Sequence, residues 1–359
     1  MSKIMHIVGA RPQFIKMAPL YNALENSVEQ IIVHTGQHYD FEMSDVFFDE
    51  LKIHEPDYNL EVGSGTHGSQ TANIILHLEK VLMNENPDMV IIYGDTNSTL
   101  GASLTCGKLY YPIVHVEAGV RSGNMHMPEE INRIVTDKLS SFLFAPIKSS
   151  VENLKNEGIS KGVYNTGDIM YDILKNNLTQ IEHRKIFLDQ LSIKENKYIL
   201  ATVHREINTD KESLCKIVNA FSEINEVIIF PIHPRTKKML VKYNLLHKLI
   251  GKRNIKLIPP VGYLEMLILE KFARIIVTDS GGIQKEAYII GVPCITLRNE
   301  TEWKETVRDG WNILVGNDKE KIIDSINSFH PKGRRKNIFG DGNSALTMKG
   351  IIIEYLNEQ

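Results

Sequence analysis

The stretch KIMHIVGARPQFIKMAPLYNAL, from Lys3 to Leu24, joins a strand pattern directly to a helix pattern. Its first six residues, ending at Val8, are largely apolar and partly β-branched, which is typical of a buried strand. Pro12 then stands where a first-turn proline belongs, and apolar side chains follow at helical spacing. A strand that leads through a short loop into a helix predicts a parallel α/β sheet.

The same alternation runs along the chain and begins again after about residue 195. In the first half the strand patterns are Lys3 to Val8, Gln30 to His34, Met89 to Tyr93, Ile113 to Val116 and Phe142 to Ala145. In the second half they are Tyr198 to Val203, Glu226 to Ile232, Ile255 to Ile258, Arg274 to Thr278 and Cys294 to Leu297. Two doubly wound halves, each a parallel sheet with helices on both faces, account for this pattern.

The length agrees with two domains, since 359 residues exceed twice the roughly 150 that a domain usually contains. The polar stretch 176–197 has little strand signal and is expected to hold helix and connector. We expect a first domain at 1–168 and a second at 169–343. An amphipathic segment at 344–359 follows the glycine-rich FGDGN and is expected to cross back onto the first half.

The composition restricts the partners and the compartment. The 41 Lys and Arg against 44 Asp and Glu leave a net charge of −3, which disfavours nucleic acid as the main partner. The three cysteines are far apart and form no disulfide or CxxC pattern, which indicates a reducing compartment. The N-terminus lacks the pattern of a signal peptide and no apolar run is long enough to span a membrane, so we expect a cytoplasmic protein.

Two strand-end loops have the features of anion sites. In the first, Gly9-Ala10-Arg11-Pro12 opens a helix that carries Lys16 one turn in, although a surface arginine after a strand is the alternative interpretation. The loop lacks GxGxxG spacing, which argues against a nicotinamide cofactor. In the second, Ser280, Gly281 and Gly282 follow a strand and open a helix, where the glycines permit close approach of phosphate. Ser280 as an ordinary N-cap is the alternative there.

Carboxylates gather at strand ends of the first half. Asp95 ends one strand pattern, Glu117 ends the next, and Glu129 and Glu130 open the helix after Pro128. Strand ends of one parallel sheet lie close together, so these acids are candidates for paired general acid and base work. An N-cap cluster after Asp95 is the competing interpretation there, and a helix-dipole role is favoured for Glu130.

The second half adds imidazole and guanidinium groups at two strand ends, in His204-Arg205-Glu206 and His233-Pro234-Arg235. These groups suit phosphate binding and protonation of a leaving group. A metal site is not expected, because the spacing of the histidines shows no convergent ligand set. No nucleophile motif such as GxSxG is present, so covalent catalysis has no candidate.

These residues resemble the non-hydrolysing UDP-N-acetylglucosamine 2-epimerase family. The resemblance covers essentially the whole chain, through GARP (9–12), HTGQHYD (34–40), YGDTNST (93–99), HVEAGVRS (115–122), MPEEINR (127–133), HPRT (233–236), TDSGGIQKEA (278–287) and FGDGN (339–343). It implies two Rossmann-like domains facing a cleft, the glycosyltransferase B-type arrangement, with the C-terminal helix on the first domain. It also implies a homodimer that needs no cofactor and no metal.

The resemblance assigns roles by position. Family members eliminate UDP to leave a 2-acetamido-glycal and add it back with C2 inverted. The positions that match catalytic groups are Asp95, Glu117, Glu129 and His204. Those expected to bind UDP are Arg11, Lys16, His204, His233, Arg235, Met266, Ser280, Gly281, Gly282 and, at the ribose, Glu286. Those expected near the sugar are Gln37, His38, Arg133, Arg298, Glu302 and Trp303.

The substrate is predicted from departures within the family. Trp303 stands where UDP-N-acetylglucosamine enzymes more often have arginine-proline, and the sequence looks more like the branch that acts on UDP-2,3-diacetamido-2,3-dideoxy-glucuronate for glycan synthesis. UDP-N-acetylglucosamine is the second candidate, with Trp303 then a packing residue. His204-Arg205-Glu206 lacks a double arginine common in bacterial members, which argues against allosteric activation. The competing hypotheses for the activity are a hydrolysing relative, a glycosyltransferase and a non-catalytic sugar-nucleotide sensor.

Overall fold

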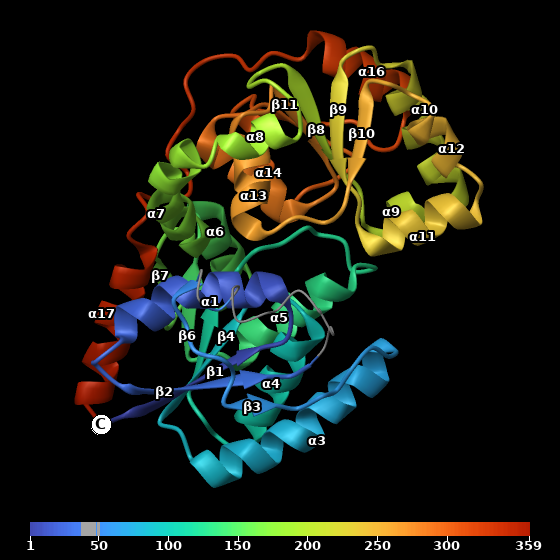
Figure 1. Cartoon of the computed structure of the whole chain (residues 1–359). Helices are drawn as coiled ribbons and strands as arrows, with labels where there is room; N and C mark the ends of the chain where they lie inside the picture. The colour runs from blue at the N-terminus through green and yellow to red at the C-terminus, as the bar shows by residue number, and fades with distance from the viewer. Residues whose placement is uncertain (37–47, 49–50) are drawn as a thin grey trace. The chain divides into compact units, whose positions relative to one another are not determined.

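A computed structural model describes residues 1–36, 48 and 51–359 of the chain (Figure 1). These residues divide into two compact units. Unit 1 comprises Met1–Lys175 and Asn337–Gln359, and unit 2 comprises Asn176–Lys336. Each contains one parallel sheet with helices, which confirms the predicted pair of α/β halves.

Unit 1 contains a seven-stranded parallel sheet in the order β3-β2-β1-β4-β5-β6-β7. Its strands are β1 (Lys3–Val8), β2 (Glu29–His34), β3 (Tyr58–Asn59), β4 (Met89–Tyr93), β5 (Ile113–Val116), β6 (Phe142–Ala145) and β7 (Val163–Asn165). The strand order reverses between β1 and β4, and ligands of such sheets bind beyond the carboxyl ends at this point.

Helices cover both faces of this sheet. They are α1 (Arg11–Leu24), α3 (His67–Glu85), α4 (Asn97–Lys108), α5 (Pro128–Leu139), α6 (Lys148–Asn156), α7 (Ile169–His183), which continues into unit 2, and α17 (Ser344–Asn357). Leu78 of α3 and Cys106 of α4 join the core cluster that includes Met5 and Ile7 of β1. Helix α1 packs on β1 and β4 and against α17, so the expected return of the C-terminal helix is confirmed (Figure 1).

Unit 2 contains a six-stranded parallel sheet in the order β10-β9-β8-β11-β12-β13. Its strands are β8 (Tyr198–Thr202), β9 (Val227–Pro231), β10 (Ile255–Ile258), β11 (Ile275–Thr278), β12 (Cys294–Thr296) and β13 (Asn312–Leu314). Its helices are α8 (Ile186–Gln190), α9 (Glu206–Thr209), α10 (Lys211–Glu223), α11 (Pro234–Lys242), α12 (Leu246–Ile250), α13 (Tyr263–Lys271), α14 (Gly281–Ile290), α15 (Lys304–Arg308) and α16 (Lys319–Ser328). Here the order reverses between β8 and β11.

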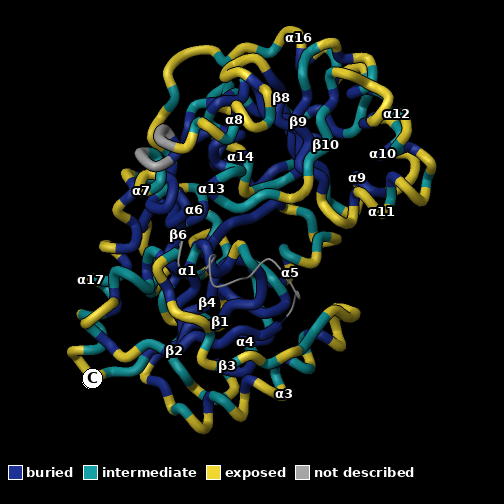
Figure 2. The backbone as a smooth tube through the Cα atoms, viewed as in Figure 1, coloured by how far each residue is buried: buried dark blue, intermediate teal, exposed yellow. Residues whose placement is uncertain are grey.

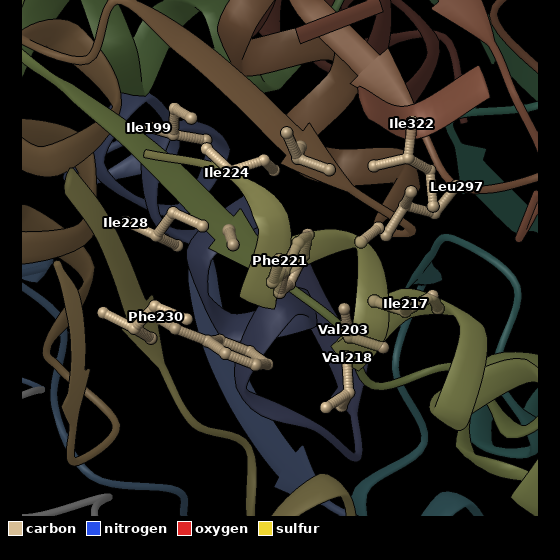
Figure 3. Packing of buried hydrophobic residues seen from close by; sticks show 14 of the residues in the cluster. Ile199, Val203, Ile217, Val218, Phe221, Ile224, Ile228, Phe230, Leu297 and Ile322 are labelled. Atoms are coloured by element: carbon tan, nitrogen blue, oxygen red, sulfur yellow. The ribbon is translucent and has the colours of Figure 1, made fainter. Parts of the chain in front are cut away.

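The core of unit 2 lies between its sheet and the helices α10 and α16 (Figure 3). The Phe221 ring of α10 meets the Phe230 ring of β9 edge to face, with centroids 6.0 Å apart. Ile199 of β8 and Ile322 of α16 complete the contact between the layers. The central strands are buried throughout, which explains why they read as continuous apolar runs (Figure 2).

The two compact units divide at 175/176 and 336/337, where the sequence led us to expect boundaries at 168 and 343. The segment before α17 belongs to unit 1 through its own hydrogen bonds. The Asp168 N–H donates to the Phe339 carbonyl at 2.9 Å, and Lys175 Nζ donates to the Asp341 carbonyl at 3.1 Å. Residues 337–343 are therefore held by the start of α7, which the sequence pattern does not reveal.

No helix of the described residues is both long enough and apolar enough to cross a membrane.

Candidate active-site residues at the strand ends

The predicted residues of unit 1 lie where β1, β4 and β5 end, at and beside the point of strand reversal. Arg11 and Lys16 belong to α1 after β1, Asp95 follows β4, and Glu117 follows β5. The structure brings Lys16 and Glu117 together, because Lys16 Nζ and Glu117 Oε2 form an ion pair. Their side chains are only 16% and 11% exposed, so this pair is partly shielded from water.

Glu117 has a backbone conformation that side-chain-bearing residues rarely adopt, with φ at +77°. Its N–H and that of Ala118 both donate to the Phe144 carbonyl of β6, which holds the chain in this turn. Residues in such conformations cost free energy and are concentrated at functional sites. The motif HVEAGVRS contains no signal for this conformation, because the strained residue is not a glycine.

Asp95 is held by Arg133 of α5. Arg133 Nε and Nη2 donate to Asp95 Oδ2 at 2.9 and 2.6 Å, and Nη1 donates to Glu130 Oε2 at 2.8 Å. The guanidinium of Arg133, which was expected near the sugar, thus orients two carboxylates. Asp95 itself is not the N-cap of α4, which is Thr96.

The two acids that open α5 differ in their surroundings. Glu130 is buried and accepts hydrogen bonds from the N–H groups of Ser122 and Gly123, at 2.9 and 2.8 Å. Burial alone would raise the pKa of Glu130, but these hydrogen bonds and the charge of Arg133 lower it below its ordinary value. Glu130 therefore holds the loop between β5 and α5 through these hydrogen bonds and does not only interact with the helix dipole. Glu129 is half-buried on the same turn.

The first anion-site loop is organised by Gln13, which accepts from the Gly9 N–H at 2.8 Å and donates to the Tyr93 carbonyl at 2.7 Å. Gly9 is required for packing, because an added Cβ would lie 1.9 Å from Ser98 Oγ. The N-cap of α1 is Ala10, which offers no side-chain hydrogen bond to the first turn. Arg11 is the first residue of this helix and is half-buried.

In unit 2 the predicted residues lie where β8 and β11 end, again at the point of strand reversal. The buried Asp279 accepts from the N–H groups of His204 and Arg205 at 3.0 and 2.9 Å, and its Oδ1 lies 3.3 Å from His204 Nδ1. Burial lowers the pKa of His204; the Asp279 charge opposes this, and the charges of Arg205 and Arg235 add to it.

His233 follows the neighbouring strand β9, and its ring centroid lies 5.5 Å from that of His204. His233 and Arg235 are exposed at the start of α11. Two imidazoles and a guanidinium therefore share the carboxyl edge of the unit 2 sheet.

The start of α14 bears out the N-cap interpretation of Ser280. Ser280 Oγ accepts from the Ile283 N–H. Gly281 and Gly282 do not close a turn with positive φ. An added Cβ would reach only ordinary contact distances, 3.6 Å from Trp303 Nε1 at Gly281 and 3.8 Å from Ser280 Oγ at Gly282. Neither glycine is required by the packing of the described residues.

Four residues near the start of α14 form two buried pairs. Arg298 and Glu302, both expected near the sugar, form a two-point ion pair with each other at 2.9 and 3.0 Å. Lys285 is 2% exposed, and its ammonium lies 4.5 Å from the ring centroid of Trp303. Glu286 is buried on α14 and interacts electrostatically with Glu270 of α13, while Met266 is half-buried on α13.

Two of the residues expected near the sugar, Gln37 and His38, lie outside the described residues. Among the residues that are described, no group of three or more His, Cys, Asp or Glu side chains could hold a metal ion.

Comparison with known proteins agrees with this geometry. The family model described as UDP-N-acetylglucosamine 2-epimerase matches residues 22–353. A "UDP-N-acetylglucosamine 2-epimerase homolog" of Methanococcus maripaludis is 56% identical, covering 98% of this chain and 99% of that protein. The UDP-2,3-diacetamido-2,3-dideoxy-D-glucuronate 2-epimerase of Pseudomonas aeruginosa is 43% identical, over 90% and 91%.

The crystal structure of the Methanocaldococcus jannaschii UDP-GlcNAc 2-epimerase in complex with UDP-GlcNAc and UDP aligns with a TM-score of 0.92. The two sequences are 45% identical, over 98% of this chain and 99% of that one. Two Rossmann-like units with reversed strand order thus define an enzyme with the glycosyltransferase B-type fold. The chain belongs to the UDP-N-acetylglucosamine 2-epimerase family, whose members are isomerases.

Proposed function

We propose that the protein is a non-hydrolysing C2 epimerase of a UDP-2-acetamido sugar. One observation carries the proposal: in a chain that belongs to this family, Asp95 and Glu117 follow neighbouring strands. Asp95 forms an ion pair with Arg133, and Glu117 forms one with Lys16. Inversion at C2 needs a proton to leave one face of the sugar and to arrive on the other. Two carboxylates on separate strands supply two such groups.

The chemistry consists of an elimination and its reversal. In the first step the C2–H bond breaks, its electron pair forms the C1=C2 bond of a glycal, and the C1–O bond releases UDP. In the second step a UDP oxygen adds to C1 and a proton is delivered to the opposite face of C2. We assign the proton transfers to Glu117 and Asp95, with Glu129 as a further candidate. No electrons are gained or lost overall.

We assign UDP binding to the residues at the carboxyl edge of unit 2, with Arg11 and Lys16 as further diphosphate ligands. Support comes from the Ser280-Gly281-Gly282 helix start, which the fold itself does not require to be glycine-rich. Backbone N–H groups at a helix N-terminus favour phosphate oxygens. His204, held beside Asp279, is placed to stabilise or protonate the departing diphosphate.

UDP-N-acetylglucosamine becomes the first candidate substrate, ahead of the diacetamido-glucuronate that the sequence favoured. In the same sequence comparison the UDP-N-acetylglucosamine 2-epimerase of Methanocaldococcus jannaschii is 48% identical to this chain, against 43% for the Pseudomonas relative. The diacetamido-glucuronate remains the second candidate. Its support is the 43% identity with the Pseudomonas relative and the Trp303 position in the sequence.

Proton NMR in D2O with each UDP sugar tests the proposal. We expect the C2 hydrogen to exchange with deuterium and a manno product to appear from one of the two sugars, without stoichiometric release of free UDP. Stoichiometric UDP with free sugar would instead identify a hydrolysing enzyme. If neither sugar exchanges its C2 hydrogen, the proposed function is wrong.

A further inference from the structure

A fully buried histidine, His115, lies on β5 two residues before Glu117. Its Nδ1 is 2.6 Å from Asp137 Oδ1, and its Nε2 is 2.8 Å from the Gly94 carbonyl oxygen. A carboxylate and a carbonyl only accept hydrogen bonds, so both contacts are satisfied by a ring that carries a proton on each nitrogen.

The His115 ring lies at one end of a row of charged side chains. Asp137 also accepts from the Gly119 N–H at 3.1 Å and pairs with Arg121 at 2.7 Å, and Arg121 pairs with Glu157 at 2.7 Å. Burial alone would raise the pKa of Asp137, but His115 and Arg121 hold it below its ordinary value. With His115 protonated, the charges alternate along the row from His115 to Glu157, whose side chain at the outer end is 28% exposed.

The His115 ring forms a hydrogen bond to the end of β4 at the point where β4 and β5 separate. The Gly94 N–H donates to the Val116 carbonyl at 3.1 Å, which is the last hydrogen bond between the two strands. Gly94 then turns with φ at +64°, so its carbonyl leaves the sheet and is bound by His115 instead. The next peptide unit begins Asp95. His115 thus fixes the backbone from which the Asp95 side chain extends.

Helix α5 contributes two side chains that hold the end of β4, one directly and one through His115. Arg133 and Asp137 are four residues apart and therefore share one face of this helix. Arg133 binds the Asp95 carboxylate directly, while Asp137 acts on the Gly94 carbonyl through His115. The side chain and the backbone of the β4 end are consequently positioned by one element.

We propose that His115 is a positioning residue, whose doubly protonated ring ties the strand end that carries Asp95 to the strand end that carries Glu117. The inference rests on the proposed function, because the two carboxylates are its proton-transfer groups. His115 touches neither substrate nor UDP in this account and acts only through the geometry of Asp95 and Glu117. Small misplacements of such groups cost about 100-fold in rate.

The test is His115→Gln, because glutamine offers one NH2 group in place of two opposed donors and leaves one acceptor unpaired. We expect kcat to fall by about 10- to 100-fold, with KM for the UDP sugar and the affinity for UDP within about two-fold of wild type. The matched control is His6→Gln on β1. His6 is equally buried, but its hydrogen bonds are to two side chains, at Tyr93 Oη and Gln30 Oε1, rather than to the backbone of a strand end.

An unchanged kcat in folded His115→Gln, or an equal loss in His6→Gln, overturns the inference. If His115→Gln does not fold, Asp137→Asn replaces it, with the same expected loss of kcat. The protonation of the His115 ring is measured by NMR of wild-type protein labelled with nitrogen-15 histidine. The His115 signal is assigned by its change in chemical shift in Asp137→Asn. Two protonated ring nitrogens near neutral pH support the inference, and one unprotonated nitrogen refutes it. A wild type that epimerises neither UDP sugar refutes the proposed function instead, and the inference falls with it.

Discussion

At the scale of single residues, Glu117 combines a strained backbone with a partly shielded ion pair to Lys16. In the proposed mechanism this carboxylate transfers a proton, and the turn comes directly after β5 ends at Val116. Strain of this kind persists only where the surrounding structure enforces it, here through the Phe144 carbonyl. The charge of the side chain, and not its size, should therefore carry the chemistry.

Glu117→Gln removes a proton-transfer group and almost no volume. We expect kcat to fall by at least about 100-fold while the affinity for UDP, measured by calorimetry, stays within about two-fold of wild type. Glu85→Gln is the matched control, since Glu85 also pairs with a lysine, Lys3, but at the opposite end of β1. Undiminished turnover in Glu117→Gln would remove Glu117 from the mechanism.

Glu270 is a second residue whose chemistry its surroundings dictate. It is fully buried on α13, and neither carboxylate oxygen has a hydrogen-bond partner among the described residues. Burial, and then the charge of Glu286, raise the pKa of Glu270 well above its ordinary value. The folded protein consequently keeps this carboxyl protonated at pH values where the unfolded chain has lost the proton.

A raised pKa in the folded state means that stability falls as pH rises from the unfolded pKa through the folded one. Glu270→Gln removes this dependence, so the unfolding midpoint in urea should fall less between about pH 5 and about pH 8 than it does in wild type. At the higher pH the variant should be at least as stable as wild type. Glu265→Gln, which keeps its cap on the Gly262 N–H, is the control on the same helix. Equal pH dependence in wild type and Glu270→Gln would show that Glu270 is not held protonated.

At the scale of elements, the sequence predicted the longer strands and missed three short edge strands. All ten expected strands are present, and nine of them occupy interior positions of their sheets, while β10 lies at an edge. The missed strands β3, β7 and β13 have two or three residues, and β3 and β7 are largely exposed. The strand signal in the sequence therefore comes from burial rather than from backbone propensity.

The candidate site follows the same division. Residues that end a strand, such as Asp95, Glu117 and Ser280, could be found because parallel strands place their ends together. The roles of Arg133, Glu130 and His115 could not, since they depend on tertiary contacts with a carboxylate, with loop N–H groups and with a strand-end carbonyl. The left-handed turn at Glu117 likewise arises from tertiary hydrogen bonds.

Helix α14 allows stability and binding to be separated. Gly282 lies in its first turn, and the nearest described atom outside the neighbouring backbone, Ser280 Oγ, would be 3.8 Å from an added Cβ. Gly282→Ala should therefore stabilise unit 2 by up to about 1 kcal/mol in urea unfolding, because alanine favours helix. The same methyl group should weaken UDP binding by about 10-fold if phosphate approaches the backbone there. Gly9→Ala is the contrast, since overlap with Ser98 predicts lost stability. Unchanged UDP affinity in Gly282→Ala would place the diphosphate elsewhere.

At the scale of the whole molecule, the chain leaves unit 1 within α7 and returns to it before α17. The departing and the returning segments are bonded to each other inside unit 1. Asp172 of α7 accepts from the Ser344 N–H at 3.0 Å and from the Ala345 N–H at 2.7 Å, so it caps the first turn of α17. The side chain of the N-cap residue Asn343 makes no such hydrogen bond.

Asp172→Ala should therefore release the C-terminal helix while the fold of unit 1 persists. Two buried N–H groups lose their acceptor, which costs about 1–3 kcal/mol for each group that finds no other partner. Hydrogen exchange should speed up in α17 and in the face of α1 that it covers, with the amides of unit 2 unchanged. Asp210→Ala, which removes the matching cap of α10 in unit 2, should show the reverse distribution. Protection of α17 equal to that of wild type would mean that its packing on α1 alone holds the returning segment, and that the Asp172 cap adds nothing to it.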